Sequence, residues 1–355
     1  MLRTWTSRLP LRSPMVATWL FVASFLIVAL VCVGGATRAT QSGLSITEWK
    51  PIAGVLPPRD AHAWDIEFDN YKKIPQFREI NPNMTVDQFK GIYWWEWAHR
   101  ILARLLGMVY LVGFVALLAM QQIPKRLVWR CAGLLGLVVL QGVVGWWMVA
   151  SGLEKLDFVA AERLATHLFM ALLLLIGSLW TAMEAEEGEP RGRGAPGTWK
   201  SVTGLLLGFV VLQCLLGALV AGNRAGLVYN DFPLMNGQFF PDVQWQKGVG
   251  YSFLHDQGLV QFMHRINAFI VLGFVAIYAV ILGRRCQDDG IRMWGRGMAF
   301  LVAIQVGLGI ATLISVVNIW FALSHQLVGV SLVMVATVLA WKVARADYAF
   351  RRGSF

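Results

Sequence analysis

Eight stretches of about 20 apolar residues are the feature that most restricts how this chain can fold. Such a stretch is the length that an α-helix needs to cross the hydrocarbon core of a bilayer. The composition agrees, because 57% of the 355 residues are hydrophobic and only 15% are charged. The sequence therefore predicts an all-α integral membrane protein with eight transmembrane helices, at 16–36, 94–119, 127–150, 164–183, 201–222, 259–283, 295–317 and 320–343.

Basic residues in the short loops indicate the orientation of these helices. They lie before the first helix, between the second and third, between the sixth and seventh, and after the last. Short loops rich in Lys and Arg face the cytoplasm, so both termini are expected there. No cleavage site follows the basic N-terminus, which favours a multi-pass protein of a bacterial inner (plasma) membrane. The net charge of +10 is then a topology signal, and we expect no nucleic-acid binding.

An internal repeat divides the chain into two halves. GLSITEWKPIAG resembles GLVYNDFPLMNG, EWAHR resembles QFMHR, QGVVG resembles QVGLG, and ATHLF resembles LSHQL, at offsets of 183, 165, 164 and 158 residues. Four matches in one order indicate a tandem duplication of a four-helix bundle, with pseudo-two-fold symmetry along the membrane normal. The expected parts are an N-terminal half at 1–183 with the substrate site, a cytoplasmic linker at 184–200, and a C-terminal half at 201–355 with the cofactor site.

Four of the six histidines lie near the outer ends of the even-numbered helices, whereas His62 and His255 are expected in solvated outer segments. Ionisable side chains within a membrane span are costly and usually face the bundle interior. Two histidines in each half can therefore face each other across a bundle core, where such folds hold cofactors and metals. The pairs are His99 with His167 and His264 with His325.

Two imidazoles in an apolar cavity fit a haem better than a zinc ion. Zinc takes three or four N, S or O ligands, and no Cys or carboxylate accompanies His264 and His325. A haem needs only two axial nitrogens and a large apolar pocket. Arg100 and Arg265 each follow a histidine and suit haem propionates, or else lipid headgroups. The glycines of the third and seventh helices either admit a flat macrocycle or serve helix packing: Gly142, Gly145, Gly307 and Gly309.

The two halves differ three residues before the first histidine of each pair. Glu96 precedes His99, whereas Gln261 precedes His264, and residues at this spacing share a helix face. A carboxylate can act as a base, a proton relay or a stabiliser of positive charge, and Glu96 is therefore the candidate catalytic residue. The alternative is that Glu96 only pairs with Arg100 and anchors the helix end. A catalytic role for Glu96 predicts that the N-terminal half contains the substrate and that the C-terminal half contains a permanent haem.

These motifs together resemble the haem A synthase family, membrane enzymes that oxidise haem O to haem A. The resemblance covers the whole chain and includes E-x-x-H-R at Glu96, His99 and Arg100. It implies haem b (iron protoporphyrin IX) on the iron ligands His264 and His325, near Arg265. It further implies haem O bound through its iron by His99 and His167, with its C8 methyl oxidised to a formyl group through a hydroxymethyl stage.

The resemblance also implies partners and a subgroup. The outer loop from Thr37 to Tyr93 contains no cysteine, whereas some members of the family have a cysteine pair there, so this chain resembles their cysteine-less proteobacterial and mitochondrial subgroup. The implied partners are haem O as substrate, the haem O synthase, membrane lipid, and an unidentified electron donor or acceptor. The implied activity is that of an oxidoreductase acting on a CH or CH3 group in cytochrome oxidase assembly.

Two other functions are compatible with the histidine pattern. One is a quinol-linked di-haem b-type cytochrome for electron transfer, in which both halves hold haem permanently. The other is a transporter built from parallel repeats, with the histidines as proton relays. Only the oxidative enzyme accounts for a carboxylate in one half alone.

Overall fold

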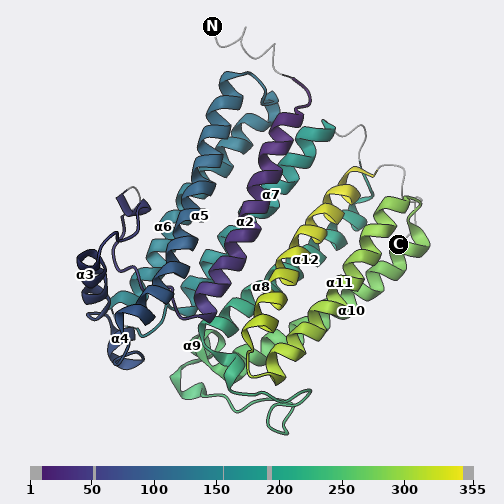
Figure 1. The fold of residues 1–355 in the computed structure, drawn as a ribbon. Coiled ribbons are helices and arrows are strands. Elements are labelled where there is room, and N and C mark those ends of the chain that lie inside the picture. The colour runs from purple at the N-terminus through teal and green to yellow at the C-terminus, as the bar shows by residue number, and fades with distance from the viewer. Residues whose placement is uncertain (1–9, 51–52, 155, 190–193, 347–355) are drawn as a thin grey trace.

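The computed structural model describes residues 10–50, 53–154, 156–189 and 194–346. Within these residues eight helices are long and apolar enough to cross a membrane, as the sequence predicts (Figure 1). They are α2 (Pro14–Ala39), α5 (Val86–Ala119), α6 (Val128–Glu154), α7 (Ala161–Glu187), α8 (Gly197–Gly222), α10 (Gln257–Arg285), α11 (Asp289–Ile314) and α12 (Ile319–Arg345).

Local sequence signals determine where several of these helices begin. Ser13 caps α2 with Pro14 in its first turn, and Asp256 and Asp288 cap α10 and α11 through their carboxylates. α5 begins at Val86, eight residues before the expected 94, because Thr85 and Gln88 form a capping box there. The added turns lie outside the apolar stretch and extend α5 into the outer segment.

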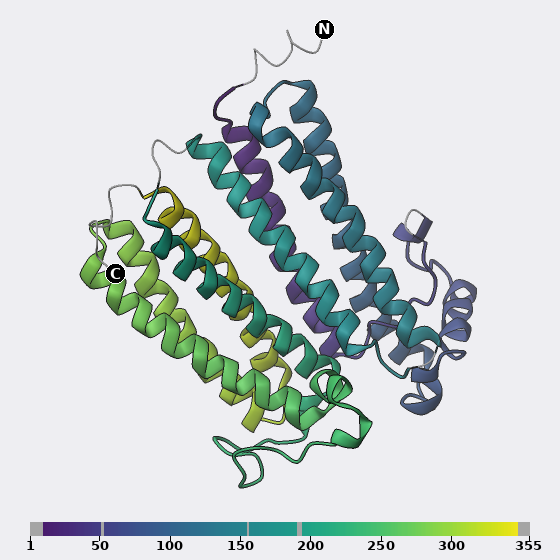
Figure 2. The ribbon, with the colours of Figure 1, turned by 180° about the vertical axis from the view of Figure 1, so that it is seen from behind.

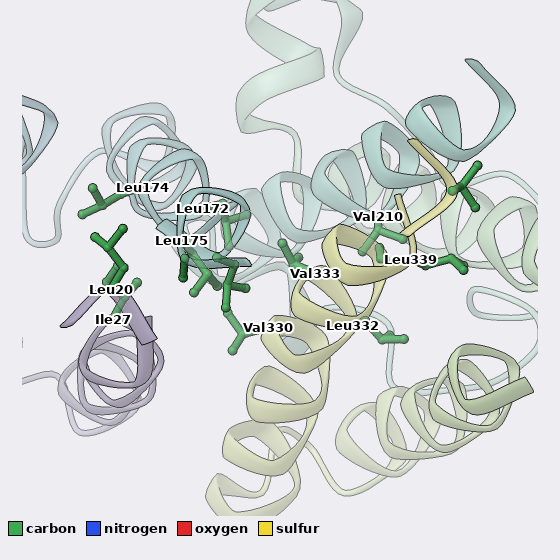
Figure 3. Packing of buried hydrophobic residues seen from close by; sticks show 14 of the residues in the cluster. Leu20, Ile27, Leu172, Leu174, Leu175, Val210, Val330, Leu332, Val333 and Leu339 are labelled. Carbon is green, nitrogen blue, oxygen red and sulfur yellow. The ribbon is translucent and has the colours of Figure 1, made fainter. Parts of the chain in front are cut away.

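The helices pack in two rings. In the first ring α2 contacts α5 and α7, and α6 contacts α5 and α7; in the second α8 contacts α10 and α12, and α11 contacts α10 and α12. The rings meet where α7 packs on α8 and where α12 packs on α2 and α7, as both views show (Figure 2). The core is densest at this meeting point, where buried aliphatic side chains interlock (Figure 3): Leu20, Ile27, Leu172, Leu175, Val330 and Val333.

The outward faces of the helices are apolar. Phe25 is 71% exposed, Ile277 63% and Phe300 67%. Large apolar side chains in such numbers on an outer surface are costly in water and favourable in lipid. The surface therefore agrees with a multi-pass membrane protein.

The outer segments lie at one end of the bundle, opposite the start of α2 and the end of α12 (Figure 1). Between α2 and α5 they comprise η2 (Ala53–Val55), α3 (Ala61–Tyr71) and α4 (Pro75–Glu79). This segment forms a separate buried core with the first turns of α5, in which Phe68 and Tyr71 of α3 pack with Phe89 and Tyr93 of α5. Between α8 and α10 lie η4 (Ala225–Leu227), η5 (Trp245–Lys247) and α9 (Val249–His255), whereas η3 (Lys125–Leu127) lies between α5 and α6.

A cluster of charged and aromatic side chains joins the halves at their outer ends. Arg38 of α2 donates to the carbonyls of Ala221 (2.7 Å) and Gly222 (3.3 Å) at the end of α8. The guanidinium groups of Arg38 and Arg224 lie 5.1 and 3.4 Å from the ring centroid of Phe158. Cation–π contact and hydrogen bonds to carbonyls at a helix end therefore hold the two rings together here.

Candidate functional site

The four membrane histidines have the same setting. Each ring packs against a glycine of the preceding helix, where no side chain would fit without displacement. A β-carbon added to Gly34, Gly145, Gly217 or Gly309 would lie 3.1, 3.0, 3.2 or 2.9 Å from Cε1 of His99, His167, His264 or His325, respectively. The structure thus gives each half two half-buried imidazoles, each packed against a glycine.

The C-terminal pair has the spacing of two ligands on one metal centre. The ring centroids of His264 and His325 lie 6.3 Å apart, with their planes at 76°. A ligating imidazole nitrogen lies about 2 Å from its metal, which places two ring centroids on opposite sides of one ion about 6 Å apart. In the N-terminal half His99 and His167 pack on Gly34 and Gly145 in the same manner. The predicted C-terminal pair is therefore brought together.

The surroundings of the pairs fit a haem. Among the described residues no group of three His, Cys, Asp or Glu side chains is placed to share a metal, so each site offers two imidazoles in apolar surroundings. The Nδ1 atoms of His99 and His167 and the Nε atom of Arg265 are buried without a regular hydrogen bond. Such atoms are rare in folded proteins and indicate sites for additional partners. The chemistry of the ligands and the free donor of Arg265 suit an iron macrocycle with carboxylate side groups.

The glycines singled out from the sequence divide into two kinds. Gly145 and Gly309 contact the rings of His167 and His325. An added β-carbon at Gly142 or Gly307 would meet no atom within 4 Å. Only the first two are therefore needed for the close approach of a histidine.

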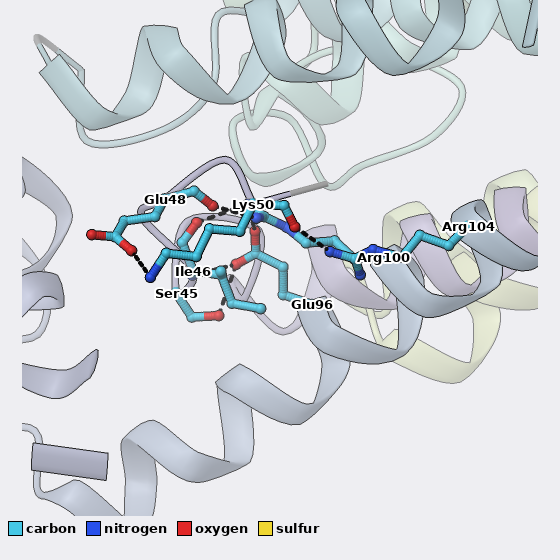
Figure 4. Close-up of polar contacts among 7 residues, drawn as sticks. All are labelled: Ser45, Ile46, Glu48, Lys50, Glu96, Arg100 and Arg104. Carbon is cyan, nitrogen blue, oxygen red and sulfur yellow. Dashed lines mark hydrogen bonds and ion pairs between the residues drawn. The ribbon is translucent and has the colours of Figure 1, made fainter. Parts of the chain in front are cut away.

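Glu96 is buried, with 4% of its surface exposed, and all its described partners are hydrogen-bond donors (Figure 4). Its Oε2 atom accepts from the hydroxyl of Ser45 and the backbone N–H of Ile46, both at 2.8 Å. Its Oε1 atom accepts from Arg100 at 2.7 Å. The ion pair with Arg100, the alternative considered for this residue, is thus present, and Glu96 also anchors the outer segment.

Arginines of α5 extend this anchor. Arg100 also donates to the carbonyls of Ile46 (2.7 Å) and Glu48 (2.9 Å), and Arg104 donates to that of Lys50 (2.9 Å) (Figure 4). Lys50 pairs with the Glu48 carboxylate. The segment after Ser45 is therefore held on α5 by charge-assisted hydrogen bonds.

At the equivalent position in the C-terminal half, Gln261 donates hydrogen bonds to its loop, whereas Glu96 accepts them from its own. Gln261 donates through Nε2 to the carbonyls of Ala225 (2.9 Å) and Tyr229 (3.1 Å) and accepts from Arg265 (3.2 Å). The N-terminal loop presents donors to this position, whereas the C-terminal loop presents carbonyls. Glutamate and glutamine therefore each match the loop that they hold.

A cleft of about 430 Å³ lies beside the Glu96 anchor, between the outer segment and α5. Its walls include Glu67, Tyr93, Arg100 and Arg104. Burial raises the pKa of the Glu67 carboxyl, partly offset by the charge of Lys50. The cleft is amphipathic and opens on the outer side of the bundle.

Several residues near the histidines were not found by sequence reasoning. Gln213 and Asn267 form a hydrogen-bonded pair beside His264, and Gln305 lies beside His325. Gln305 and its counterpart Gln141 begin the repeated segments QVGLG and QGVVG, so the repeat was a signal for them. For Asn267 the sequence offered no comparable signal.

The two other histidines lie apart from these pairs. His255 ends α9 in the outer segment, 3.9 Å from the Glu162 carboxylate. His62 lies in α3 and is exposed. Neither contributes to a candidate haem site.

Comparison with known proteins gives consistent matches over nearly the whole chain. The family described as "Cytochrome oxidase assembly protein" (COX15-CtaA) matches residues 17–337. A protein of Caulobacter sp. (strain K31) named "Heme A synthase" is 49% identical over 336 residues, which are 94% of this chain and 97% of the relative. Proteins of the same name from Bradyrhizobium sp. (strain ORS 278) and Sphingopyxis alaskensis are 44% and 43% identical, covering 93% of this chain and 90% and 92% of the relatives.

Proposed function

This chain belongs to the cytochrome oxidase assembly family that contains the haem A synthases, and we propose that it oxidises the C8 methyl of haem O to the formyl group of haem A. The observation that supports this most directly is the presence of two half-buried histidine pairs, one in each four-helix ring, in different polar surroundings. One pair suits a resident haem and the other a haem that is changed and released.

The C-terminal half would hold the cofactor. His264 and His325 would ligate haem b, and the buried Nε atom of Arg265 would be available to a propionate. When bound, haem b supplies one-electron transfer. The side chains of this half orient and retain it.

The N-terminal half would hold the substrate. His99 and His167 would bind the iron of haem O, and Arg100 would contribute positive charge near its carboxylates. Arg100 is already bonded to Glu96 and to two loop carbonyls, so a propionate there would share the guanidinium with the loop.

Glu96 would handle protons. Conversion of a methyl group through a hydroxymethyl stage to a formyl group breaks C–H bonds and adds an oxygen atom, so protons must be accepted near the substrate. A carboxylate can accept a proton, whereas the carboxamide of Gln261 at the equivalent place cannot at neutral pH. The anchor formed by Ser45, Ile46 and Arg100 would keep this carboxylate at a fixed position one helical turn from His99.

The setting follows from the topology. We place the protein in a bacterial inner membrane with both termini in the cytoplasm, because basic residues gather at the end of the bundle opposite the outer segments. Haem O would arrive from the haem O synthase, and electrons would be exchanged with a separate donor or acceptor.

The test is chemical identification of the haems. The purified protein, expressed in a host that makes haem O, should contain haem b and produce haem A and its hydroxymethyl precursor, identified by extraction and mass spectrometry. Two retained b-type haems with no conversion of haem O would instead indicate a di-haem electron carrier. A colourless protein would indicate a transporter.

A further inference from the structure

One position distinguishes the four histidine sites. It lies four residues before the glycine that contacts each ring, and residues at this spacing share a helix face. Glutamine stands there in three sites, at Gln141, Gln213 and Gln305, and leucine in the fourth, at Leu30. Leu30 belongs to the site of His99.

Gln213 holds His264 closely. Its Nε2 atom donates to the His264 carbonyl at 3.0 Å and lies 3.1 and 3.3 Å from the two ring nitrogens. Asn267 donates to the Gln213 Oε1 atom at 2.8 Å and so fixes the carboxamide.

The ring of His325 is held in a similar way. Its Nδ1 atom lies 3.1 Å from the backbone carbonyl of Gln305, and its Nε2 atom lies 3.4 Å from the carboxamide of the same residue. Both rings of the C-terminal pair therefore have polar support.

The N-terminal pair lacks this support. Gln141 donates to the backbone carbonyl of His167 at 3.0 Å and makes no described bond to its ring. The Nδ1 atoms of His167 and His99 are buried without a regular hydrogen bond. The side chain of Leu30 packs against the apolar core instead.

Hydrogen bonds to the second ring nitrogen orient a ligating histidine and strengthen its bond to the metal. Loss of such a partner typically weakens metal binding about 10- to 100-fold. A histidine without one can rotate and release its ligand more readily. A substrate haem must enter and leave, whereas a cofactor haem must stay.

We propose that Leu30 and Leu102 allow the haem of the N-terminal site to exchange. Neither leucine can form the hydrogen bonds with which Gln213 and Asn267 hold His264 in the C-terminal half. Leu102 follows His99 by three residues, as Asn267 follows His264. Leu30 is thus a positioning residue that acts through His99. This inference rests on the proposed function and deepens it.

The experiment measures release of each haem from the intact purified protein. Wild type and variants are mixed with an apo-globin acceptor, and the transferred haem is separated chromatographically into haem b and haem O or A. In Leu30→Gln/Leu102→Asn, release of haem O and A should slow about 10- to 100-fold while haem b is unchanged. In Gln213→Leu, release of haem b should accelerate by a similar factor, and its low-spin electron paramagnetic resonance signal should shift.

Matched variants separate this effect from a loss of packing. Leu26→Gln introduces the same carboxamide one turn further from His99 and should leave release of haem O and A unchanged. Gln213→Asn keeps a carboxamide, with a donor for the His264 carbonyl and an acceptor for Asn267, and should release haem b more slowly than Gln213→Leu. If the double variant fails to fold, the two substitutions of Gln213 still test whether a carboxamide at this position slows the release of haem.

Unchanged release of haem O and A in a folded double variant would overturn the inference, as would unchanged release of haem b in Gln213→Leu. A wild-type protein without haem b or haem A formation would instead overturn the proposed function. The two failures are thus distinguishable.

Discussion

Gln326 of α12 donates a 2.6 Å hydrogen bond to the carbonyl of Val31 in α2, and this bond joins the two halves beside both histidine sites. Gln326 directly follows His325, and Val31 lies one turn before Gly34, which contacts His99. The side chain of Gln326 fills the space left by Gly35, where an added β-carbon would overlap its carboxamide. The two halves therefore pack closely at this point, next to Gly34 and His325.

Replacing Gly35 with Ala should displace Gln326 and weaken the contact between the halves. Overpacking of this kind costs about 1–3 kcal/mol, which a denaturant or thermal unfolding measurement in detergent can detect. Gly107→Ala is the control, since an added β-carbon there meets no atom within 4 Å. Equal stability of the two variants would contradict the packing argument.

Replacing His264 or His325 with Ala should remove haem b. The reason is that two axial nitrogens hold the iron, and the ring spacing of 6.3 Å suits one ion between them. The visible spectrum and the extracted haem content check this, with His62→Ala as a control outside the bundle. An unaltered spectrum in either axial variant would show that this pair does not bind haem b.

Replacing His99 or His167 with Ala should leave haem b in place but stop haem A formation. The two pairs lie in separate rings of helices, so loss of one ligand set does not remove the other. Haem extraction from the purified variants measures both outcomes. Loss of all haem from a folded His167→Ala protein would contradict the division of labour between the halves.

Replacing Glu96 with Gln should give a folded protein that contains haem b and accumulates haem O or the singly hydroxylated intermediate. The substitution removes the group that can accept a proton. It also sets the NH2 group of the new carboxamide against one of the three donors that bind the carboxylate, which are Ser45, the Ile46 N–H and Arg100.

Ser45→Ala separates these two effects, because it removes one hydrogen bond of about 1 kcal/mol and leaves the carboxylate in place. We expect this variant to keep most haem A formation. If Glu96→Gln makes haem A at close to the normal rate, Glu96 serves only as an anchor. If Ser45→Ala is as inactive as Glu96→Gln, the position of the loop is what matters.

Hydropathy and spacing in the sequence were enough to predict the eight helices and their order. A run of about 20 apolar residues has few alternatives to a membrane helix, because every backbone polar group must be satisfied within the segment in lipid. The starts of α5 and α11 were the exceptions, eight and six residues before the predicted positions. A hydropathy pattern follows the lipid-facing turns, whereas the capping box at Thr85 begins the helix in the outer segment.

The histidine pairs could likewise be chosen from the sequence, because an ionisable residue within an apolar stretch is conspicuous and the repeat showed which ones correspond. The repeat also pointed to Gln305 and Gln141, but the hydrogen bond between Gln213 and His264 could not be predicted. Gln213 lies 51 residues from His264, so only the packing of helices brings them together. The same holds for Gln326 and Val31, which lie 295 residues apart.

The contrast between Glu96 and Gln261 shows most clearly what each level determines. The sequence by itself established that a carboxylate stands in one half and a carboxamide in the other, and it suggested a chemical reason. The tertiary structure added that Ser45 and Ile46 present donors to Glu96, whereas Ala225 and Tyr229 present carbonyls to Gln261. Whether a loop offers N–H groups or carbonyls depends on its backbone path over the helix end, which residue identity alone does not encode.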